Sequence, residues 1–165
     1  MNTRPATPDD APEITTIYNE GIEDRVATFE TRPRTPDDVR AWFTEPRFPI
    51  VVVEDAGRVI AFASTSLYRP RECYAGIAEY SVYVARNARG RGAGRIAMHA
   101  LIRAAEAAGF WKLVSRIFVE NTASRALMRS LGFREVGIYE KHGQLDGVWR
   151  DVVIVERLLQ PEEQP

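Results

Sequence analysis

Residues 89–95 constrain this chain more than any other segment, because they place three glycines among three arginines in the sequence RGRGAGR. Glycine accepts positive φ angles and close approach of other groups to the backbone. An alternating strand pattern, IAEYSVYVA, precedes the segment, and a helical pattern that closes at Gly109 follows it. A strand, a glycine turn and a helix N-terminus together offer free NH groups and a positive dipole end. The segment therefore predicts a site for a ligand that bears several phosphates, with charge added by Arg86, Arg89, Arg91 and Arg95.

Two other interpretations of this segment are weaker. Gly92, Gly94 and Ala97 satisfy the GxGxxA pattern of dinucleotide-binding folds, but seven residues separate Val84 from Gly92, where such folds have a tight turn. An RNA-binding Arg-Gly tract is typical of disordered tails, whereas the six residues RGRGAG lie between periodic elements. The flanking elements thus favour the phosphate site.

Two copies of the sequence TPDD, at 7–10 and 35–38, predict helix starts. In each copy Thr is the N-cap, Pro takes the first helical position and the acids occupy the first turn. The helices that follow should pack through apolar stripes: Ile14, Ile17, Tyr18 and Ile22 in the first, and Val39, Trp42 and Phe43 in the second.

The remaining patterns predict an α/β (α+β) fold with a mixed, mostly antiparallel sheet. Turns at 55–57 and 146–147 indicate antiparallel hairpins, the second with a type I′ turn. The expected order is strand, two helices, three strands, helix, strand, helix and two strands, which gives about seven strands and about four helices on both faces. We expect one domain over residues 1–160 and a disordered tail over 161–165.

Composition limits the functions of such a fold. Lys and Arg number 22 against 23 Asp and Glu, so the net charge of −1 gives no overall attraction to nucleic acid or an anionic membrane. Cys73 is the single cysteine, which excludes an internal disulfide and a cysteine-based zinc site, and we expect it to be a small apolar filler. No apolar run is long enough for a signal peptide or a membrane span, so we expect a cytoplasmic protein without a bound metal, nucleic-acid partner or membrane partner.

The segment VARNARGRGAG resembles the acyl-CoA-binding motif of the GNAT N-acetyltransferases, with Arg89, Gly92 and Gly94 at the matching positions. Downstream, ENTASRALMRSLGF resembles the second motif of that family, an Asn followed by a short helix and a Gly-Phe pair. The resemblance implies acetyl-CoA as co-substrate. The residues implied to bind it are Val82, Tyr83 and Val84, the turn residues Arg89, Gly90, Arg91, Gly92, Ala93, Gly94 and Arg95, and Asn121.

Further segments, among them TFETRP, YRPRECY and AEYSVYV, resemble the branch that acetylates phosphinothricin, methionine sulfoximine and related glutamate mimics. FWKLVSRIF and the ending HGQLDGVWRDVVIVERL resemble most the arsinothricin N-acetyltransferases within that branch. This implies acetylation of small glutamate-like amino acids by direct transfer in a ternary complex, a resistance role, and a homodimer. The implied catalytic residues are Glu79 and Tyr83, and the implied substrate-binding residues are Phe29, Arg69, Arg71, Tyr74 and Tyr83.

The chemistry of amine acetylation agrees with this assignment. Strand alternation puts Glu79, Ser81 and Tyr83 on one face, so Glu79 faces the substrate while main-chain groups of Val82 and Val84 pair with the pantetheine arm. A Glu with an ordinary pKa of ~4.3 matches an ammonium group poorly. We therefore expect Glu79 to be partly buried with a raised pKa, or to accept the proton through water.

Two arginines and a methionine complete the expected site. Arg69 and Arg71 lie between predicted strands, where their guanidinium groups suit a substrate carboxylate together with a phosphinate or arsinate oxygen. Met128 stands where GNAT proteins often have Tyr and this branch has His; methionine cannot donate a proton, so water or Tyr83 would protonate the departing thiolate.

Alternatives stay open at this point. Within the enzymes, these are an acetyltransferase for a protein N-terminus or a polyamine. Outside them, the Met128 substitution keeps a non-catalytic CoA-binding module in consideration. Of the two histidines, we expect His99 to be structural and regard His142 as a further candidate for the substrate pocket.

Overall fold

A computed structural model describes residues 1–161 of the chain. Seven strands form one sheet in the order β1-β2-β3-β4-β5-β7-β6. Within the described residues every neighbouring pair is antiparallel except β4 with β5, which is parallel. The strands are β1 (Asn2–Pro5), β2 (Ile50–Asp55), β3 (Arg58–Leu67), β4 (Ile77–Val84), β5 (Lys112–Phe118), β6 (Arg134–Leu145) and β7 (Val148–Leu158).

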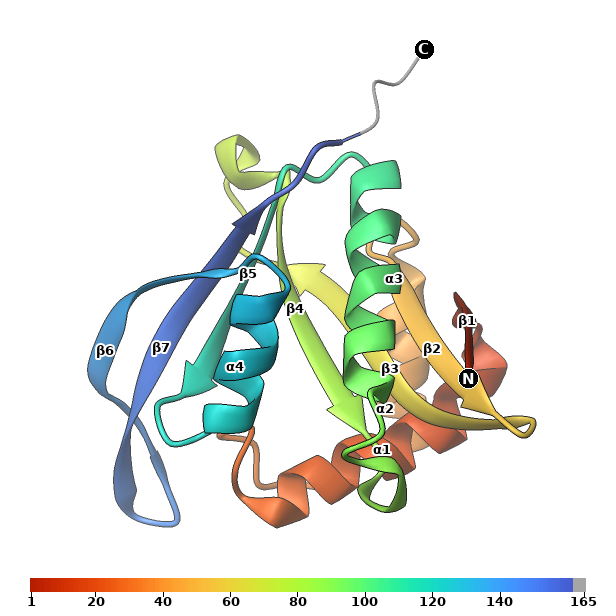
Figure 1. Cartoon of the computed structure of the whole chain (residues 1–165), viewed down its shortest axis with the longest axis horizontal. Coiled ribbons are helices and arrows are strands. Elements are labelled where there is room, and N and C mark those ends of the chain that lie inside the picture. Colours follow the sequence, from red (N-terminus) through yellow and green to blue (C-terminus); the bar gives the residue numbers. More distant parts are fainter. Residues whose placement is uncertain (162–165) are drawn as a thin grey trace.

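Helices cover both faces of the sheet, which confirms the predicted fold class and element order (Figure 1). The α-helices are α1 (Ala11–Asp24), α2 (Pro36–Arg40), α3 (Ala93–Ala107) and α4 (Thr122–Ser130), and the short 3-10 turns are η1 (Pro8–Asp10), η2 (Ala41–Thr44), η3 (Glu72–Tyr74) and η4 (Arg86–Ala88). In the view of Figure 1, α3 and α4 lie in front of the sheet, and α1 and α2 lie behind it.

The sheet separates two main hydrophobic cores. On one face, alanines of α3 such as Ala97 pack in a core with Ala61 and Ala63 of β3, so the small side chains allow the helix to approach the sheet closely. On the other face, Ile14 of α1 packs in a core that includes Phe62. Successive side chains of β3 therefore point into the two cores in turn, because side chains alternate between the faces of a strand.

Both TPDD sequences start helical segments, as predicted. Thr35 accepts a hydrogen bond from the Asp38 backbone NH, and the Asp38 side chain accepts one from the Thr35 NH. The second helix is shorter than predicted, because α2 ends at Arg40 and η2 carries the residues Trp42 and Phe43. Helical geometry stops altogether after Thr44, since Pro46 disfavours it in the residue before it, and Glu45 is extended.

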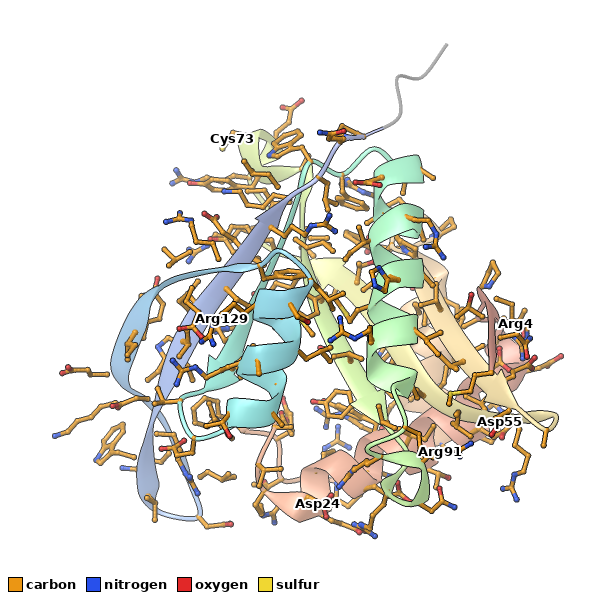
Figure 2. All side chains as sticks on the ribbon, viewed as in Figure 1. Arg4, Asp24, Asp55, Cys73, Arg91 and Arg129 are labelled. Atoms are coloured by element: carbon orange, nitrogen blue, oxygen red, sulfur yellow. The ribbon has the colours of Figure 1, made fainter. Side chains whose placement is uncertain are left out.

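Both predicted hairpin turns are present. The turn between β2 and β3 has positive φ at Ala56 and Gly57, and the turn between β6 and β7 has positive φ at Asp146 and Gly147, as type I′ geometry requires. One expectation is wrong: Cys73 is exposed on η3 and fills no core space, because the connection from β3 to β4 runs over the surface. Figure 2 shows Cys73 at the end of the molecule opposite Arg91. Of the predicted tail, residues 162–165 lie outside the described residues.

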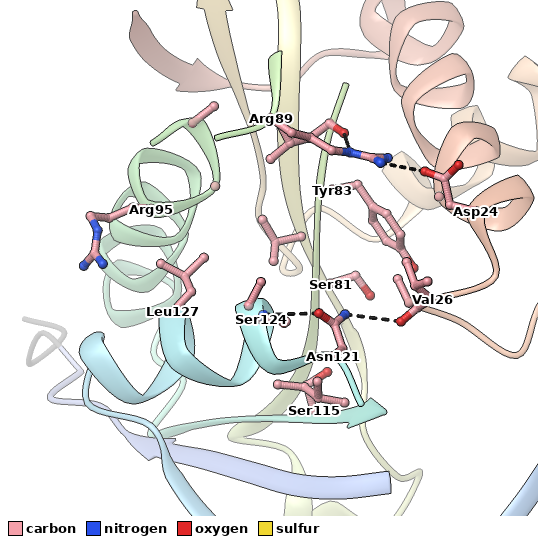
Figure 3. A pocket seen from close by; sticks show the side chains of 18 of the residues that line it. Asp24, Val26, Ser81, Tyr83, Arg89, Arg95, Ser115, Asn121, Ser124 and Leu127 are labelled. Atoms are coloured by element: carbon pink, nitrogen blue, oxygen red, sulfur yellow. Dashed lines mark hydrogen bonds and ion pairs between the residues drawn. The ribbon is translucent and has the colours of Figure 1, made fainter. Parts of the chain in front are cut away.

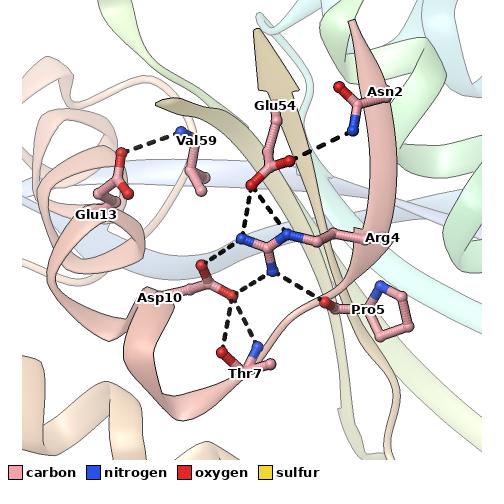
Figure 4. A network of polar contacts seen from close by, with 8 residues as sticks. All are labelled: Asn2, Arg4, Pro5, Thr7, Asp10, Glu13, Glu54 and Val59. Carbon is pink, nitrogen blue, oxygen red and sulfur yellow. Dashed lines mark hydrogen bonds and ion pairs between the residues drawn. The ribbon is translucent and has the colours of Figure 1, made fainter. Parts of the chain in front are cut away.

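An ion cluster fixes the N-terminal strand against α1 and β2 (Figure 4). Arg4 donates two hydrogen bonds of 2.8 Å to the carboxylate of Asp10 and one of 2.9 Å to Glu54. Asp10 is nearly buried, with 7% of its side chain exposed, and it also accepts a hydrogen bond from the Thr7 NH. The Arg4 guanidinium lowers the pKa of the Asp10 carboxyl. The cluster thus connects β1 and the start of α1 with β2, which is distant from both in sequence.

Candidate active site

β4 and β5 pair over a short distance and then diverge, which opens the sheet at its centre (Figure 1). Their ladder contains three residue pairs, from Ile77 with Lys112 to Glu79 with Val114. Beyond Glu79, residues 80–84 continue to pair with β3 on one side only. Ser115 Oγ donates a 3.0 Å hydrogen bond to the Tyr80 carbonyl just where the strands separate. The remaining backbone groups on this edge of β4 are available to a ligand.

A cavity of about 600 Å³ occupies the opening between the two strands (Figure 3). Its walls come from the end of α1 and the loop after it, from β4 and β5, and from the N-termini of α3 and α4. The residues that line it include Asp24, Val26, Ser81, Val82, Tyr83, Val84, Arg89, Gly90, Gly92, Ala93, Gly94, Arg95, Ser115, Arg116, Asn121, Ser124 and Leu127. Most of the residues predicted to bind the co-substrate are therefore brought together; Arg91 is not among the lining residues.

The glycine segment forms the turn that leads into α3. Gly92 is the N-cap of α3 and has a φ of 86°, a value that side-chain-bearing residues rarely adopt. At Gly94 an added Cβ would lie 3.4 Å from Val84 and 3.5 Å from Leu127. The helix N-terminus therefore lies close against β4, with its first residues in the cavity wall. This is the strand, turn and helix arrangement expected of a phosphate site.

Three of the arginines around this turn, Arg86, Arg89 and Arg91, are paired with carboxylates. Asp24, at the end of α1, accepts ion pairs from Arg89 at 2.6 Å and from Arg86 at 2.9 Å. Arg91 pairs with Asp55 at 2.7 Å, and Figure 2 shows the two side by side. The guanidinium groups of Arg89 and Arg86 lower the pKa of the Asp24 carboxyl. A phosphate ligand would therefore replace carboxylate partners at cations that are already in place.

Asn121 connects three segments at the cavity wall. Its side-chain oxygen accepts a 3.2 Å hydrogen bond from the Ser124 NH, which caps α4 as the sequence predicts. Its amide nitrogen donates to the Val26 carbonyl at 3.2 Å, in the loop after α1 (Figure 3). Met128, by contrast, is 1% exposed in the core, so α4 contributes Ser124 and Leu127 to the wall and no methionine sulfur.

Glu79 lies at the last residue pair of the β4–β5 ladder, directly before the opening. It is partly buried, as expected, with 31% of its side chain exposed. Its Oε1 forms an ion pair of 3.3 Å with Arg116 Nη2 on β5. Arg116 Nη1 in turn lies 3.4 Å from Nε2 of His142. His142 comes from a bulge in β6 where Lys141 donates its NH to Asp151.

Tyr83 lies further along β4 and packs in the aromatic core on the α1 side of the sheet. Its ring packs edge-on against Tyr18 at 5.0 Å and stacks on Phe62 at 5.6 Å between ring centres. Burial raises the pKa of the Tyr83 hydroxyl. A phenol with a raised pKa stays protonated at neutral pH but is a weak acid toward a thiolate, whose ordinary pKa is about 8.5. Of the two proton sources expected for the leaving thiol, this geometry favours water.

The predicted substrate residues lie around the same face of the sheet. Phe29, in the loop after α1, packs edge-on against Phe118 of β5 at 4.8 Å. Arg69 lies over the Tyr68 ring at 5.2 Å, and Tyr74 packs against that same ring at 5.8 Å. The hydroxyl of Tyr68, with smaller contributions from those of Tyr74 and Tyr139, raises the pKa of the Arg69 guanidinium. Arg71 is exposed at the start of η3.

Sequence reasoning missed Arg116 and Asp24. A signal for Arg116 was present, because KLVSRIF is an otherwise buried strand with one charged residue in its interior. Asp24 carried no local signal, since its partners Arg86 and Arg89 are about sixty residues away in sequence.

Within residues 1–161, no group of three or more His, Cys, Asp or Glu side chains is arranged to hold a metal ion. None of the helices described is long and apolar enough to cross a membrane.

Fold and site together define the class of protein. Residues 14–133 match the sequence model of the acetyltransferase (GNAT) family. The chain therefore belongs to the GNAT family, and its class of enzyme is the N-acetyltransferases.

Full-length relatives narrow the comparison. The L-methionine sulfoximine/L-methionine sulfone acetyltransferase of Pseudomonas aeruginosa is 38% identical over 156 residues, which cover 92% of this chain and 91% of that protein. The phosphinothricin N-acetyltransferase of Streptomyces coelicolor is 32% identical over 165 residues and 96% of both chains.

Solved structures agree with the fold. The crystal structure of a ribosomal-protein-alanine N-acetyltransferase from Brucella melitensis matches with a TM-score of 0.92 and 35% identity, over 96% of this chain and 100% of that chain. A phosphinothricin acetyltransferase from Sinorhizobium meliloti, in complex with acetyl-CoA, matches with a TM-score of 0.89 and 33% identity, over 96% of this chain and 88% of that chain.

Proposed function

We propose that this protein transfers the acetyl group of acetyl-CoA to the α-amino group of small glutamate-like amino acids, among them phosphinothricin, methionine sulfoximine and arsinothricin. One observation carries the proposal: the carboxylate of Glu79 stands at the point where β4 and β5 begin to diverge, next to a cavity bordered by a glycine turn and a helix N-terminus. The substrate class is supported by the names of full-length relatives at 32–38% identity.

The cavity residues fit acetyl-CoA as the co-substrate. Free backbone groups at the edge of β4, including those of Val82 and Val84, suit the amide groups of its pantetheine arm. Gly90, Gly92 and the first NH groups of α3, with Arg89 beside them, suit its phosphates. The thioester supplies an activated acyl carbon with a thiolate leaving group.

Glu79 holds the central position for the proton chemistry. An amino acid arrives mainly as an ammonium ion and attacks only as the free amine, so one proton must leave its nitrogen. Glu79 accepts that proton directly or through water. As the C–N bond forms and the C–S bond breaks, the nitrogen loses its second proton to water, and water returns a proton to the departing thiolate. The positive charge of Arg69 and Arg71 attracts the acidic groups of the substrate.

A second candidate, acetylation of a protein N-terminus, deserves a test because the Brucella melitensis structure carries that activity in its name. An N-terminal substrate has no free carboxylate near its amine. It would therefore use Arg69 and Arg71 differently. A polyamine has no carboxylate at all, and a non-catalytic CoA-binding module would bind acetyl-CoA without turnover.

Thiol release from acetyl-CoA tests these possibilities directly. The panel contains phosphinothricin, methionine sulfoximine, arsinothricin, glutamate, spermidine and short peptides with free N-termini. We expect rapid turnover on at least one of the three mimics and little on glutamate, spermidine or peptides. Glu79→Gln should lower kcat/KM by about 10²–10⁴-fold while acetyl-CoA still binds.

Other outcomes contradict the proposal in different ways. Turnover confined to peptides would assign the N-terminal activity, and turnover confined to spermidine would assign a polyamine activity. Tight acetyl-CoA binding with no turnover on any acceptor, and no effect of Glu79→Gln, would indicate the non-catalytic module.

The proposal includes an assembly and a role. We propose a homodimer, supported by the edge strand β6 and by exposed apolar side chains on β6 and β7, among them Ile138, Val148 and Trp149. Acetylation removes the charge of the amino group, so we propose that the enzyme inactivates toxic glutamate mimics. The supply of acetyl-CoA makes the cytoplasm the compartment that this role implies.

A further inference from the structure

Arg116 is the one cation that forms an ion pair with the proposed base Glu79 within the described residues. Its Nη2 lies 3.3 Å from Glu79 Oε1. Half of its side chain is exposed, on a strand whose neighbouring residues Leu113, Ile117 and Phe118 are buried, and it lines the cavity between β4 and β5. An exposed guanidinium in the wall of a cavity is available to an anionic ligand.

The reacting nitrogen must come within hydrogen-bond distance of Glu79, either directly or through one water. In an α-amino acid the carboxylate carbon is two bonds from that nitrogen, so its oxygens lie about 3 Å away. Any α-carboxylate therefore falls within the reach of a cation beside Glu79. Arg116 is such a cation.

We propose that Arg116 binds the α-carboxylate of the substrate, so that Glu79 and Arg116 together recognise the zwitterionic head group of an amino acid. This rests on the proposed function, because it assigns the specificity of that same site. The head group carries a positive and a negative group at about the spacing of the Glu79–Arg116 pair, in the complementary order. Its ammonium faces the carboxylate and its carboxylate faces the guanidinium.

The ion pair also explains how the Glu79 carboxylate becomes free to contact the substrate ammonium. Within residues 1–161, Glu79 is the one carboxylate that forms an ion pair with Arg116. When a substrate carboxylate takes the guanidinium, Glu79 loses that partner at the moment when the ammonium arrives beside it. The substrate ammonium then replaces the guanidinium as the partner of the Glu79 carboxylate.

The other arginines suit a different part of the substrate. Arg69 and Arg71 are exposed on the connection between β3 and β4, and Arg69 stacks on Tyr68. Their charge and their exposure on this connection fit the oxyanion at the far end of a glutamate mimic. The two charged ends of the substrate would then be bound by cations from different elements.

A matched pair of substrates separates this role from a structural one. Steady-state kinetics are measured for methionine sulfoximine and for its α-carboxamide, which keeps the amine and removes the negative charge. The wild-type protein should prefer the acid by about 10–100-fold in kcat/KM. Arg116→Gln should raise KM for the acid by a similar factor, reduce the preference to near unity, and leave KM for acetyl-CoA unchanged. Arg116→Lys should restore part of the preference.

Controls make each outcome decisive. Arg134, the exposed first residue of β6, pairs with Glu156 of β7. Arg134→Gln should leave the ratio of kcat/KM for the acid to kcat/KM for the amide unchanged. Equal losses on acid and amide in Arg116→Gln, or an unchanged ratio, would overturn the inference while leaving the acetyltransferase activity in place. Absence of wild-type turnover on every amino acid in the panel would instead reject the proposed function, and the inference with it.

Discussion

At the scale of single residues, a close contact to a glycine determines how the aromatic core around Tyr83 is built. Gly21 lies in α1, and a Cβ added there would lie 2.6 Å from two ring atoms of Tyr83. Tyr83 cannot move away freely, because its ring is packed between Tyr18 and Phe62. The absence of a side chain at Gly21 thus allows α1 to approach β4.

Replacing Gly21 tests this packing. Gly21→Ala gains about 1 kcal/mol of helix propensity but forces an overlap that typically costs more, so the free energy of unfolding should fall by about 1–2 kcal/mol. Gly137→Ala is the control, because nothing lies within 4 Å of a Cβ at that position of β6. Urea unfolding measures both variants. A Gly21→Ala protein as stable as the wild type would show that the packing is looser than described.

At the scale of secondary-structure elements, the Arg4 cluster joins β1, η1 and β2. Because Arg4 lowers the pKa of Asp10 below its ordinary value of 3.8, the carboxylate stabilises the folded state fully above that pH. The contribution is lost as the pH falls from 3.8 through the lower folded-state value. The free energy of unfolding that the Arg4–Asp10 ion pair contributes should therefore decrease at acid pH.

Arg4→Met measures that contribution. At pH 7 the variant should lose about 1.5–3 kcal/mol in free energy of unfolding, since it removes hydrogen bonds to two carboxylates and leaves Asp10 nearly buried without its cation. The difference from wild type should shrink as the pH is lowered below 3.8, as followed by urea unfolding at several pH values. A difference that does not change between pH 7 and pH 3 would contradict the role given to Asp10.

Elements with a local signal were predictable from the sequence, and those set by distant partners were not. The Thr35 cap and the turns at Gly57 and Gly147 follow from the residues themselves. The divergence of β4 from β5 does not, because neither strand pattern encodes where a parallel neighbour ceases to pair. Alternation alone places Glu79 on one face of β4. The charged residue inside KLVSRIF was a signal for Arg116, but its pairing with Glu79 depends on where β5 lies and could not be predicted.

At the scale of the whole molecule, the opening between β4 and β5 couples ligand binding to stability. A ligand that binds only the folded protein stabilises it by RT ln(1 + [L]/Kd), about 2.7 kcal/mol at a concentration of 100 Kd. The ligand here would contact elements from both sides of the opening, including α1, α3, α4, β4 and β5.

A pair of glycine variants tests whether the proposed phosphate turn is needed for acetyl-CoA to stabilise the folded protein. Gly92 and Gly57 both have positive φ, at 86° and 77°, and both would place a new side chain in open space. Gly92→Val and Gly57→Val should each lose about 1–3 kcal/mol through backbone strain. Thermal unfolding with acetyl-CoA should show stabilisation in wild type and Gly57→Val and little in Gly92→Val. Equal stabilisation in the two variants would place the binding site elsewhere.

The short ladder between β4 and β5 also bears on how the chain folds. On one side of it, β1 to β4 pair antiparallel with neighbours that are mostly close in sequence, and on the other side β5, β7 and β6 form a second antiparallel group. Three parallel residue pairs join the groups, and the chain must pass through α3 before they can form. We therefore expect the boundary between the two antiparallel groups, where the proposed active site lies, to be the part of the sheet whose local opening costs the least free energy.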